Sequence, residues 1–225
     1  MSHTLENSRA EAPVRAAEIV REYGLFAGSD KVAGVSHDGR HVWAALGATM
    51  VAFDPASGET TRTLDHAGDA GTAFDGKHLW QIAEARIDKI DPATGAVLAS
   101  NPAPGHGGDS GLAWAEGSLW VGQYRSKQIH QLDPATGKVL RTIESNRFVT
   151  GVTWVEGELW HGTWEGDESE IRRIDPKSGT VLDRLAMPPG TGVSGLESDG
   201  ADLFCAGGGG SGKVRAVRRP KTIHS

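Results

Sequence analysis

Residues 90–98 read IDPATGAVL and residues 132–140 read LDPATGKVL, so the chain contains nearly the same nine residues twice. Two related segments, FDPASGETT from Phe53 and IDPKSGTVL from Ile174, bring the number of copies to four. The Asp-Pro steps of these copies are 37, 42 and 42 residues apart. Internal similarity at a period of roughly 40 residues is typical of repeat proteins, and it constrains the fold more strongly than any single motif.

A second signature precedes each Asp-Pro segment. It reads GVSHDGRHVW, GTAFDGKHLW, GLAWAEGSLW and GVTWVEGELW, and a fifth copy, GLESDGADLF, ends in Phe. The leading glycines define five units that begin near residues 34, 71, 111, 151 and 195. Asp-Gly or Glu-Gly within the signature favours a tight hairpin, and Asp-Pro-x-Ser/Thr-Gly favours a second turn. A complete unit is therefore predicted to contain four short antiparallel strands.

Four strands in about 40 residues, repeated five times, predict an all-β fold, a five-bladed β-propeller of four-stranded antiparallel blades. The fifth unit has only three evident strands, whereas residues 16–26 precede the first unit and read as a further strand, AAEIVREYGLF. We expect this N-terminal strand to close the last blade as its outer strand. The predicted organisation is a flexible tail over residues 1–12 and a single propeller domain over residues 13–225.

The aromatic residue that ends each signature is expected to pack between blades, because a four-stranded sheet must bury its faces against a neighbour. These residues are Trp43, Trp80, Trp120, Trp160 and Phe204. The single cysteine, Cys205, follows the last of them and is expected to be a buried, inert thiol.

Composition excludes several classes of partner and predicts a location. A formal net charge of −6 argues against binding of nucleic acid, which relies on clustered Lys and Arg. No stretch approaches the roughly 20 apolar residues of a membrane-spanning helix, and no secretory signal is evident at the start. One cysteine permits no internal disulfide, which favours a reducing compartment, and a cytoplasmic location is expected.

Candidate site residues are those that break the repeat. Equivalent positions after the aromatic carry unlike residues, namely Gly47, Glu84, Tyr124, Trp164 and Gly208. The linkers that enter the inner strands carry further polar residues, namely His66, Asp69, His106, Asp109 and Arg147. Both sets are expected at the mouth of the central channel, where a few polar groups with one or two aromatic rings are typical of a ligand pocket.

We expect Glu84 or Glu165 to act as a general base if the protein is an enzyme. The predicted ligand-binding residues are Trp164, Tyr124, Arg125, Gln123, Asp109, Arg147 and His106. Asp109 with His106 is a possible acid–base or metal pair, but the chain lacks the tight His and Cys spacings of a metal centre. Neither a metal nor a cofactor is therefore expected.

Two units, GLAWAEGSLWVGQYRSKQIHQLDPATGKVLRTIE and GVTWVEGELWHGTWEGDESEIRRIDPKSGTVL, resemble blades of the glutaminyl-peptide cyclotransferase family of the plant and bacterial type. The resemblance covers about residues 34–220, and propellers similar to streptogramin lyase share its Trp and Asp-Pro elements. It implies a five-bladed propeller that converts N-terminal glutamine into pyroglutamate without a redox cofactor.

The resemblance also implies where the family's site residues fall. Trp164 matches the tryptophan of the fourth blade, and the asparagine that enters this blade falls near Thr150. The family's acid, its second-blade tryptophan and its last-blade lysine fall at Ala44, at Glu84 and near Gly208. A chain without that acid and that lysine is expected to be related to the cyclotransferases without being an authentic glutaminyl cyclase.

Three functions follow from these observations. The first is binding of a small polar, amino-acid-like or peptide ligand at the channel mouth. The second is a cofactor-independent cyclotransferase or lyase reaction with a channel-mouth Glu as general base. The third is a non-catalytic scaffold on whose ring face partner proteins dock. Fold class alone does not choose among them, because propellers carry many unrelated activities.

Overall fold

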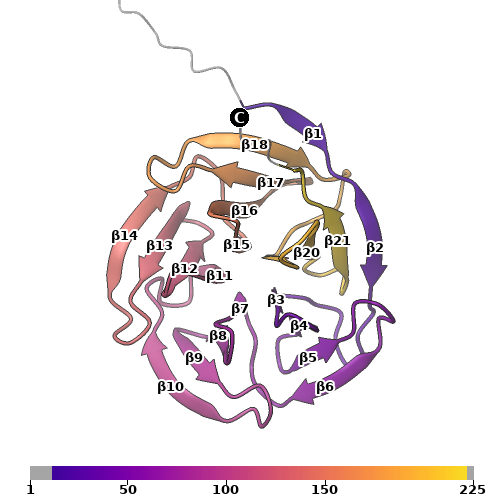
Figure 1. Ribbon diagram of the computed structural model, residues 1–225, viewed down its shortest axis with the longest axis vertical. Coiled ribbons are helices and arrows are strands. Elements are labelled where there is room, and N and C mark those ends of the chain that lie inside the picture. Colours follow the sequence, from indigo (N-terminus) through magenta and orange to yellow (C-terminus); the bar gives the residue numbers. More distant parts are fainter. Residues whose placement is uncertain (1–11, 222–225) are drawn as a thin grey trace, which may run out of the picture.

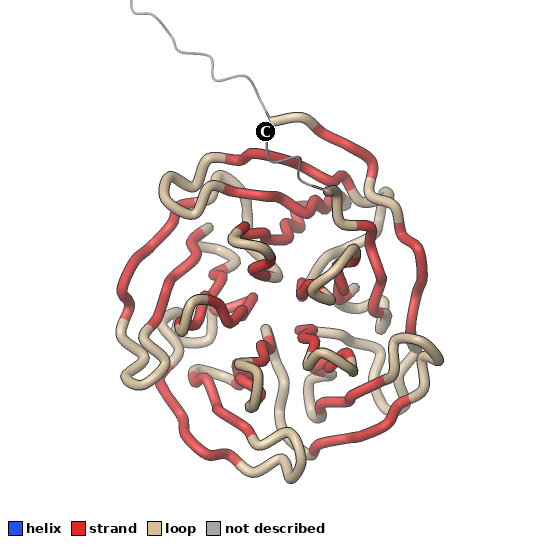
Figure 2. Tube along the Cα trace, in the orientation of Figure 1, coloured by secondary structure: helices blue, strands red, loops and turns tan. Residues whose placement is uncertain are grey.

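The computed structural model describes residues 12–221, which form five β-sheets arranged in a ring around a central axis (Figure 1). The described residues contain strands, turns and loops and no helix (Figure 2). The predicted all-β, five-bladed propeller is therefore confirmed. The tail predicted over residues 1–12 lies, apart from Ala12, outside the described residues. Between residues 12 and 221 there is accordingly no helix of a length and apolar character that would cross a bilayer.

Each blade contains four antiparallel strands that follow one another from the axis outward. From the first blade to the fifth, the inner strands are β3 (Gly34–His37), β7 (Thr72–Phe74), β11 (Asp109–Ala115), β15 (Val152–Val155) and β19 (Gly195–Ser198). The second strands are β4 (Val42–Ala45), β8 (Leu79–Ala83), β12 (Ser118–Gln123), β16 (Glu158–Glu165) and β20 (Leu203–Gly207). The third strands are β5 (Met50–Phe53), β9 (Arg86–Ile90), β13 (Gln128–Leu132), β17 (Glu168–Ile174) and β21 (Val214–Arg218). The outer strands are β6 (Thr60–Leu64), β10 (Val97–Pro102), β14 (Val139–Glu144), β18 (Val181–Ala186) and β2 (Ile19–Tyr23).

The repeated Asp-Pro segment forms the turn between the third and the outer strand. In the third blade, Asp133 accepts a hydrogen bond through its carboxylate from the Ala135 N–H (2.8 Å) and through its carbonyl from the Gly137 N–H (2.8 Å). Gly137 has a φ of +71°, a conformation that a residue with a side chain rarely adopts. The same sequence recurs because four corners require the same backbone geometry.

The N-terminal strand closes the ring as the sequence predicts. β2 pairs antiparallel with β21 and so becomes the outer strand of the fifth blade. The shorter β1 (Val14–Ala16) was not anticipated, and it pairs parallel with β18 as a fifth strand of the fourth blade. The N-terminal segment therefore joins two neighbouring blades.

Five glycines surround the axis at the start of the inner strands. A Cβ atom on any of them would lie within 3.0 Å of backbone atoms of the next blade, and Gly195 faces the first blade in this way. They are Gly34, Gly71, Gly111, Gly151 and Gly195. The recurrence of glycine at this position thus has a steric cause, since the blades meet backbone to backbone at the centre.

Tryptophans fill four of the five interfaces between blades, as predicted. Trp80 stacks on Trp114 of the following blade with ring centroids 6.0 Å apart, and Trp160 packs on Phe204 at 5.0 Å. Trp120 packs in the same way on Trp154, at 4.9 Å. Trp80, Trp120 and Trp160 are almost fully buried, whereas Trp114 and Trp154 are partly buried. Together they contribute the large apolar area that holds neighbouring blades together.

Phe204 packs between the fourth and fifth blades as predicted, but it does not occupy the strand position of the tryptophans. Cys205 pairs with Glu197, just as Trp160 pairs with Thr153, so the cysteine occupies the position that tryptophan has in the other blades. Phe204 corresponds instead to Leu159 of the fourth blade.

An extra residue in the fifth blade's first hairpin causes this shift. The paired residues Ser198 and Phe204 are six positions apart, whereas the matching pair Trp154 and Leu159 are five apart. The position equivalent to Trp164 consequently shifts by one residue from the predicted Gly208 to Gly209. At the interface of the fifth and first blades, Tyr23, Phe26 and Phe53 supply the missing aromatic area.

Candidate functional site

A cavity of about 440 Å³ lies where the linkers enter the inner strands and the second strands end. We call it the mouth cavity. All five blades contribute to its wall through the linkers, which supply Lys31, Asp69, Asp109, Thr150 and Ser194 in blade order. Tyr124 from the end of β12 and Trp164 from the end of β16 complete the wall. A concave site of this size with two aromatic rings is suited to a small molecule.

Trp164 and Tyr124 are held in place by each other and by glycines. The indole of Trp164 covers Gly192 and Gly209, where a Cβ atom would lie less than 3.0 Å from ring carbons, and its Nε1 donates to the Gly166 carbonyl (3.0 Å). Tyr124 donates from its hydroxyl to the Trp164 carbonyl (2.9 Å), and its ring packs on Phe148. These contacts orient two aromatic surfaces of adjacent blades before any ligand is present.

Asp109 is the buried acid of the mouth cavity. An irregularity in the pairing of β11 and β12 follows Asp109, and the bend brings its carboxylate under the loop that precedes the strand. Both carboxylate oxygens accept from the Gly105 N–H (3.0 and 2.9 Å), and one also accepts from Gln123 Nε2 (3.3 Å). Burial raises the pKa of Asp109, although these hydrogen bonds act in the opposite direction. The acid therefore takes up a proton more readily than an exposed carboxylate.

A smaller cavity of about 390 Å³ adjoins the mouth cavity and shares Asp109 and Tyr124 with it. Its wall also contains Gln123 and Arg125. Gln123 Oε1 accepts from the Ser126 hydroxyl (2.5 Å), so its amide nitrogen faces Asp109. Five residues that the sequence singled out, Asp109, Gln123, Tyr124, Arg125 and Trp164, thus surround two adjoining cavities.

Glu165 and Arg147 form an ion pair beside this site (2.9 Å) and line neither cavity. Glu165 also accepts from the Phe148 N–H (2.8 Å). Burial alone would raise the pKa of Glu165, but the Phe148 N–H and the Arg147 guanidinium stabilise the charged form and lower it. The pair fixes the linker that carries Phe148 and, through that ring, supports Tyr124.

Glu84 and His106 line neither cavity. The Glu84 side chain is 78% exposed and forms an ion pair with Arg86 (3.1 Å), while its N–H donates to Asp69. His106 is exposed in a loop where its φ is +48°. Both residues have left-handed backbone conformations, so tight turns direct them outward. The site assignment of these two residues remains a prediction.

Two rim residues, Asp30 and Lys31, were not identified from the sequence. They precede the first inner strand in the segment SDKVAG, which is the fifth member of the set of linkers that supplied Asp69 and Asp109. Treating this segment as a linker would have found them. His66 also belongs to a linker, yet it lies 3.4 Å from Asp88 in the second blade and not in the wall of the mouth cavity.

The part of the chain that the structure describes contains no group of three or more His, Cys, Asp or Glu side chains arranged to hold a metal ion. The mouth cavity therefore offers isolated carboxylates, hydroxyl groups and aromatic rings. Such a donor set is suited to hydrogen bonding and to recognition of a positively charged group.

Comparison with known proteins supports the fold. No family model matches the sequence. No curated protein matches it either. Among solved structures, the glutaminyl cyclase of Myxococcus xanthus is similar over 92% of this chain and 98% of its own, with a TM-score of 0.75 and 16% identity. The WD40 repeats of RRP9 are similar over 91% of this chain and 99% of their own, with a TM-score of 0.57 and 10% identity. The resemblance to the cyclotransferases is thereby confirmed at the level of the propeller fold.

Proposed function

We propose that the protein binds a small amino-acid-like or peptide ligand in the mouth cavity and recognises it through a free amino group. The observation that carries this proposal is the combination in one cavity of a buried carboxylate, Asp109, with the aromatic rings of Trp164 and Tyr124. An ammonium group donates a charge-assisted hydrogen bond to a carboxylate and is attracted to the face of an aromatic ring.

The charges at the rim favour the same ligand class. Asp30, Asp69 and Asp109 line the cavity together with a single cation, Lys31. An excess of carboxylates attracts a ligand amine, and the ammonium group of Lys31 provides a partner for a ligand carboxylate or carbonyl. Val32 and Ala33 add apolar surface for a side chain. The fold of this chain is that of a glutaminyl cyclase, and the name of that enzyme denotes action on a glutaminyl group, which supports the amino-acid-like class.

Calorimetric titration with short peptides tests this proposal. Peptides with a free N-terminus should bind, and N-acetylated peptides should bind at least about tenfold more weakly, because a charge-assisted hydrogen bond contributes roughly 1.5–3 kcal/mol. Asp109→Asn should reduce the affinity by a similar factor. The control Asp167→Asn changes an exposed carboxylate outside the cavities and should leave it unchanged.

Equal binding of acetylated and free peptides would contradict recognition of the amine. If no free amino acid or short peptide binds, the ligand-binding proposal fails and the scaffold alternative gains support.

A catalytic use of the same site is the second candidate, and the raised pKa of Asp109 favours it. Cyclisation of N-terminal glutamine needs a group that takes a proton from the attacking amine, and a base with a pKa closer to neutral does so better. The sequence predicted Glu84 or Glu165 for this role. Glu84 is exposed, and the lowered pKa of Glu165 makes it a weaker base.

Ammonia release from glutaminyl peptides, measured for Asp109→Asn, Glu84→Gln and Glu165→Gln, separates these candidates. Loss of turnover only in Asp109→Asn would assign the base to the buried acid. Peptide binding without ammonia release would leave the binding proposal intact and exclude the cyclotransferase reaction.

A further inference from the structure

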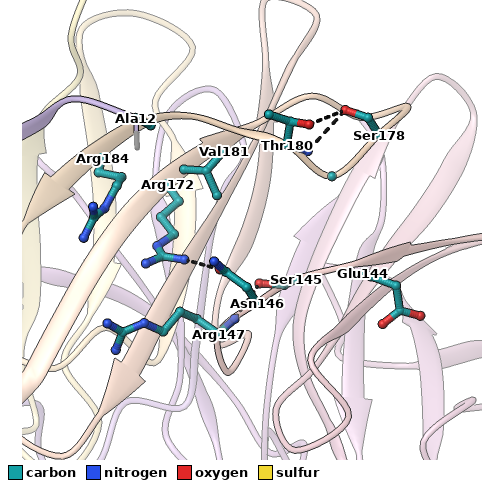
Figure 3. A pocket seen from close by; sticks show the side chains of 11 residues that line it. Ala12, Glu144, Ser145, Asn146, Arg147, Arg172, Ser178, Thr180, Val181 and Arg184 are labelled. Atoms are coloured by element: carbon teal, nitrogen blue, oxygen red, sulfur yellow. Dashed lines mark hydrogen bonds between the residues drawn. The ribbon is translucent and has the colours of Figure 1, made fainter. Parts of the chain in front are cut away.

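A separate cavity of about 530 Å³ lies between the third and fourth blades, and it shares no lining residue with the mouth cavity. We call it the arginine pocket. Three arginines, Arg147, Arg172 and Arg184, line it together with Asn146, Ser178 and Thr180 (Figure 3). Arg172 comes from β17 and Arg184 from β18, whereas Ser178 and Thr180 belong to the Asp-Pro turn that joins these strands. Strands, a turn and a linker thus contribute to one wall.

The charge of this pocket is asymmetric. Figure 3 shows the guanidinium groups of Arg147, Arg172 and Arg184 on one side of the view, with Glu144 on the other. Glu144 is the only acidic residue among the described lining residues, and its carboxylate accepts from Gln128 Nε2 (2.8 Å). Behind this wall, Glu165 pairs with Arg147, and Glu170 pairs with both Arg172 and Arg184. Three guanidinium groups against two carboxylates leave the wall with a net charge of +1.

The fourth blade departs from the repeat at these positions. Arg172 and Arg184 are directly paired across β17 and β18, and like charges in such a pair destabilise a sheet. The equivalent pairs in the first three blades are Val51 with Thr63, Asp88 with Ser100, and His130 with Thr142. None of these contains two cations. A pair of arginines is thus specific to this blade and is not required by the propeller framework.

The guanidinium groups are held in fixed positions. Glu170 accepts from Arg172 Nε (2.6 Å) and from Arg184 Nη2 (2.5 Å), so one carboxylate bridges the two cations. Arg172 Nη1 donates to Asn146 Oδ1 (2.8 Å), which leaves the amide nitrogen of Asn146 as a donor. The Arg172 side chain is only 4% exposed, yet it lines the pocket. A buried cation that already lies in a rigid arrangement can bind an anion with little loss of conformational entropy.

We propose that the arginine pocket binds the phosphate group of a small organic phosphate. Guanidinium groups match the geometry of phosphate oxygens, and donors from three elements surround the space, which suits a group with three terminal oxygens better than a planar carboxylate. The amide nitrogen of Asn146 is a further donor at the wall. The volume leaves room for an organic moiety beside the phosphate.

Titration of the full chain with inorganic phosphate and with glycerol 3-phosphate, which has no amino group, in an otherwise phosphate-free buffer tests the proposal. Both should bind saturably, and Arg147→Gln should weaken binding at least tenfold. The matched control is Arg62→Gln, which removes an exposed arginine that donates to carbonyls of a turn in the second blade. It should leave phosphate affinity unchanged. Arg172→Lys retains the positive charge and loses the planar fork, so it should also weaken binding, and it provides a second variant that keeps a cation beside Glu170.

Three results would overturn the proposal. Absence of saturable binding by both phosphates excludes the site. Equal phosphate affinity in Arg147→Gln, Arg172→Lys and the natural chain places the phosphate elsewhere. Tighter binding of malonate than of phosphate would assign the pocket to dicarboxylates. The peptide titration probes the mouth cavity, so its outcome does not depend on whether phosphate binds in the arginine pocket.

Discussion

At the scale of single residues, the buried acid Glu197 has an unusually high pKa for a carboxyl group. It lies on the inner strand β19, where its carboxylate accepts from the Thr153 hydroxyl of the neighbouring blade and from the Ser198 N–H (2.9 Å). Burial raises the pKa of Glu197 to about 7 from an ordinary value of 4.5. Its hydrogen bonds only partly offset the cost of placing a charge between two inner strands. The acid therefore links the stability of the ring to pH.

The expected effect of Glu197 on stability has a definite sign. The folded state holds the proton more tightly than the unfolded state, so the contribution is fully present below pH 4.5 and is lost as the pH rises through about 7. A shift of this size corresponds to on the order of 3 kcal/mol. Glu197→Gln should remove this dependence, so that the variant gains stability relative to the natural chain between pH 5 and pH 8.

Urea unfolding at a series of pH values measures the difference. Glu168→Gln, at an exposed position on β17, is the control and should unfold with the pH dependence of the natural chain. A constant difference between natural chain and Glu197→Gln at every pH would show that the acid does not titrate in this range.

At the scale of elements, closure of the ring depends on one strand. β2 supplies Tyr23 to the interface of the fifth and first blades, and Phe26 follows it into the same cluster. Tyr23 also donates to the Pro55 carbonyl of the first blade (3.0 Å). β1 differs, because its three residues are exposed and its Arg15 side chain forms an ion pair with Asp183. The two strands of the N-terminal segment therefore contribute unequally to stability.

Truncation measures that inequality. A chain that starts at Gly28 lacks both strands and both aromatic residues, and loss of two buried aromatics costs on the order of 6 kcal/mol. It should not unfold cooperatively. A chain that starts at Glu18 lacks only β1 and should lose about 1–2 kcal/mol, the scale of a few strand hydrogen bonds.

Thermal unfolding followed by circular dichroism checks both chains against a control that starts at Ala12, which retains every described strand. An unchanged melting curve for the chain that starts at Gly28 would refute closure by β2.

At the scale of the whole molecule, the five interfaces are not equivalent. Four are filled by tryptophans, whereas the interface between the fifth and first blades has Cys205 at the tryptophan position and aromatic residues from β2 and β5 around it. The reactivity of the Cys205 thiol therefore reports whether the fifth and first blades separate before the rest of the ring unfolds.

Labelling of Cys205 with a thiol reagent should occur only through global unfolding. Burial raises the pKa of Cys205 to about 12, and only 4% of the residue is exposed, so the reactive thiolate is absent from the closed ring. The labelling rate should increase with denaturant as steeply as global unfolding does.

A chain that carries Ser57→Cys together with Cys205→Ala is the control, because Ser57 is exposed, and it should react at once. Labelling of Cys205 that depends weakly on denaturant would show instead that the fifth and first blades separate locally.

The sequence by itself determined the number of blades, the turns and the closing strand, because each depends on local chemistry that is repeated. Asp133 and Gly137 belong to a corner that any copy of the motif forms, and the ring glycines recur because the blades meet at their backbones. Trp164, Tyr124 and Asp109 could be selected in advance because they interrupt that repetition. The sequence did not indicate β1, since three exposed residues carry no apolar pattern.

Only the tertiary structure decided which of these residues meet. Glu84 and Trp164 follow equivalent strands, yet a left-handed turn directs Glu84 into solvent, while glycines of the next blade hold Trp164 over the mouth cavity. One additional residue in a hairpin moved Cys205 into a tryptophan's place. The arginine pocket is formed by residues that are close only when the third and fourth blades pack together. Repetition is encoded locally, but a site is formed by contacts between repeats, and those contacts depend on small shifts in register and turn geometry.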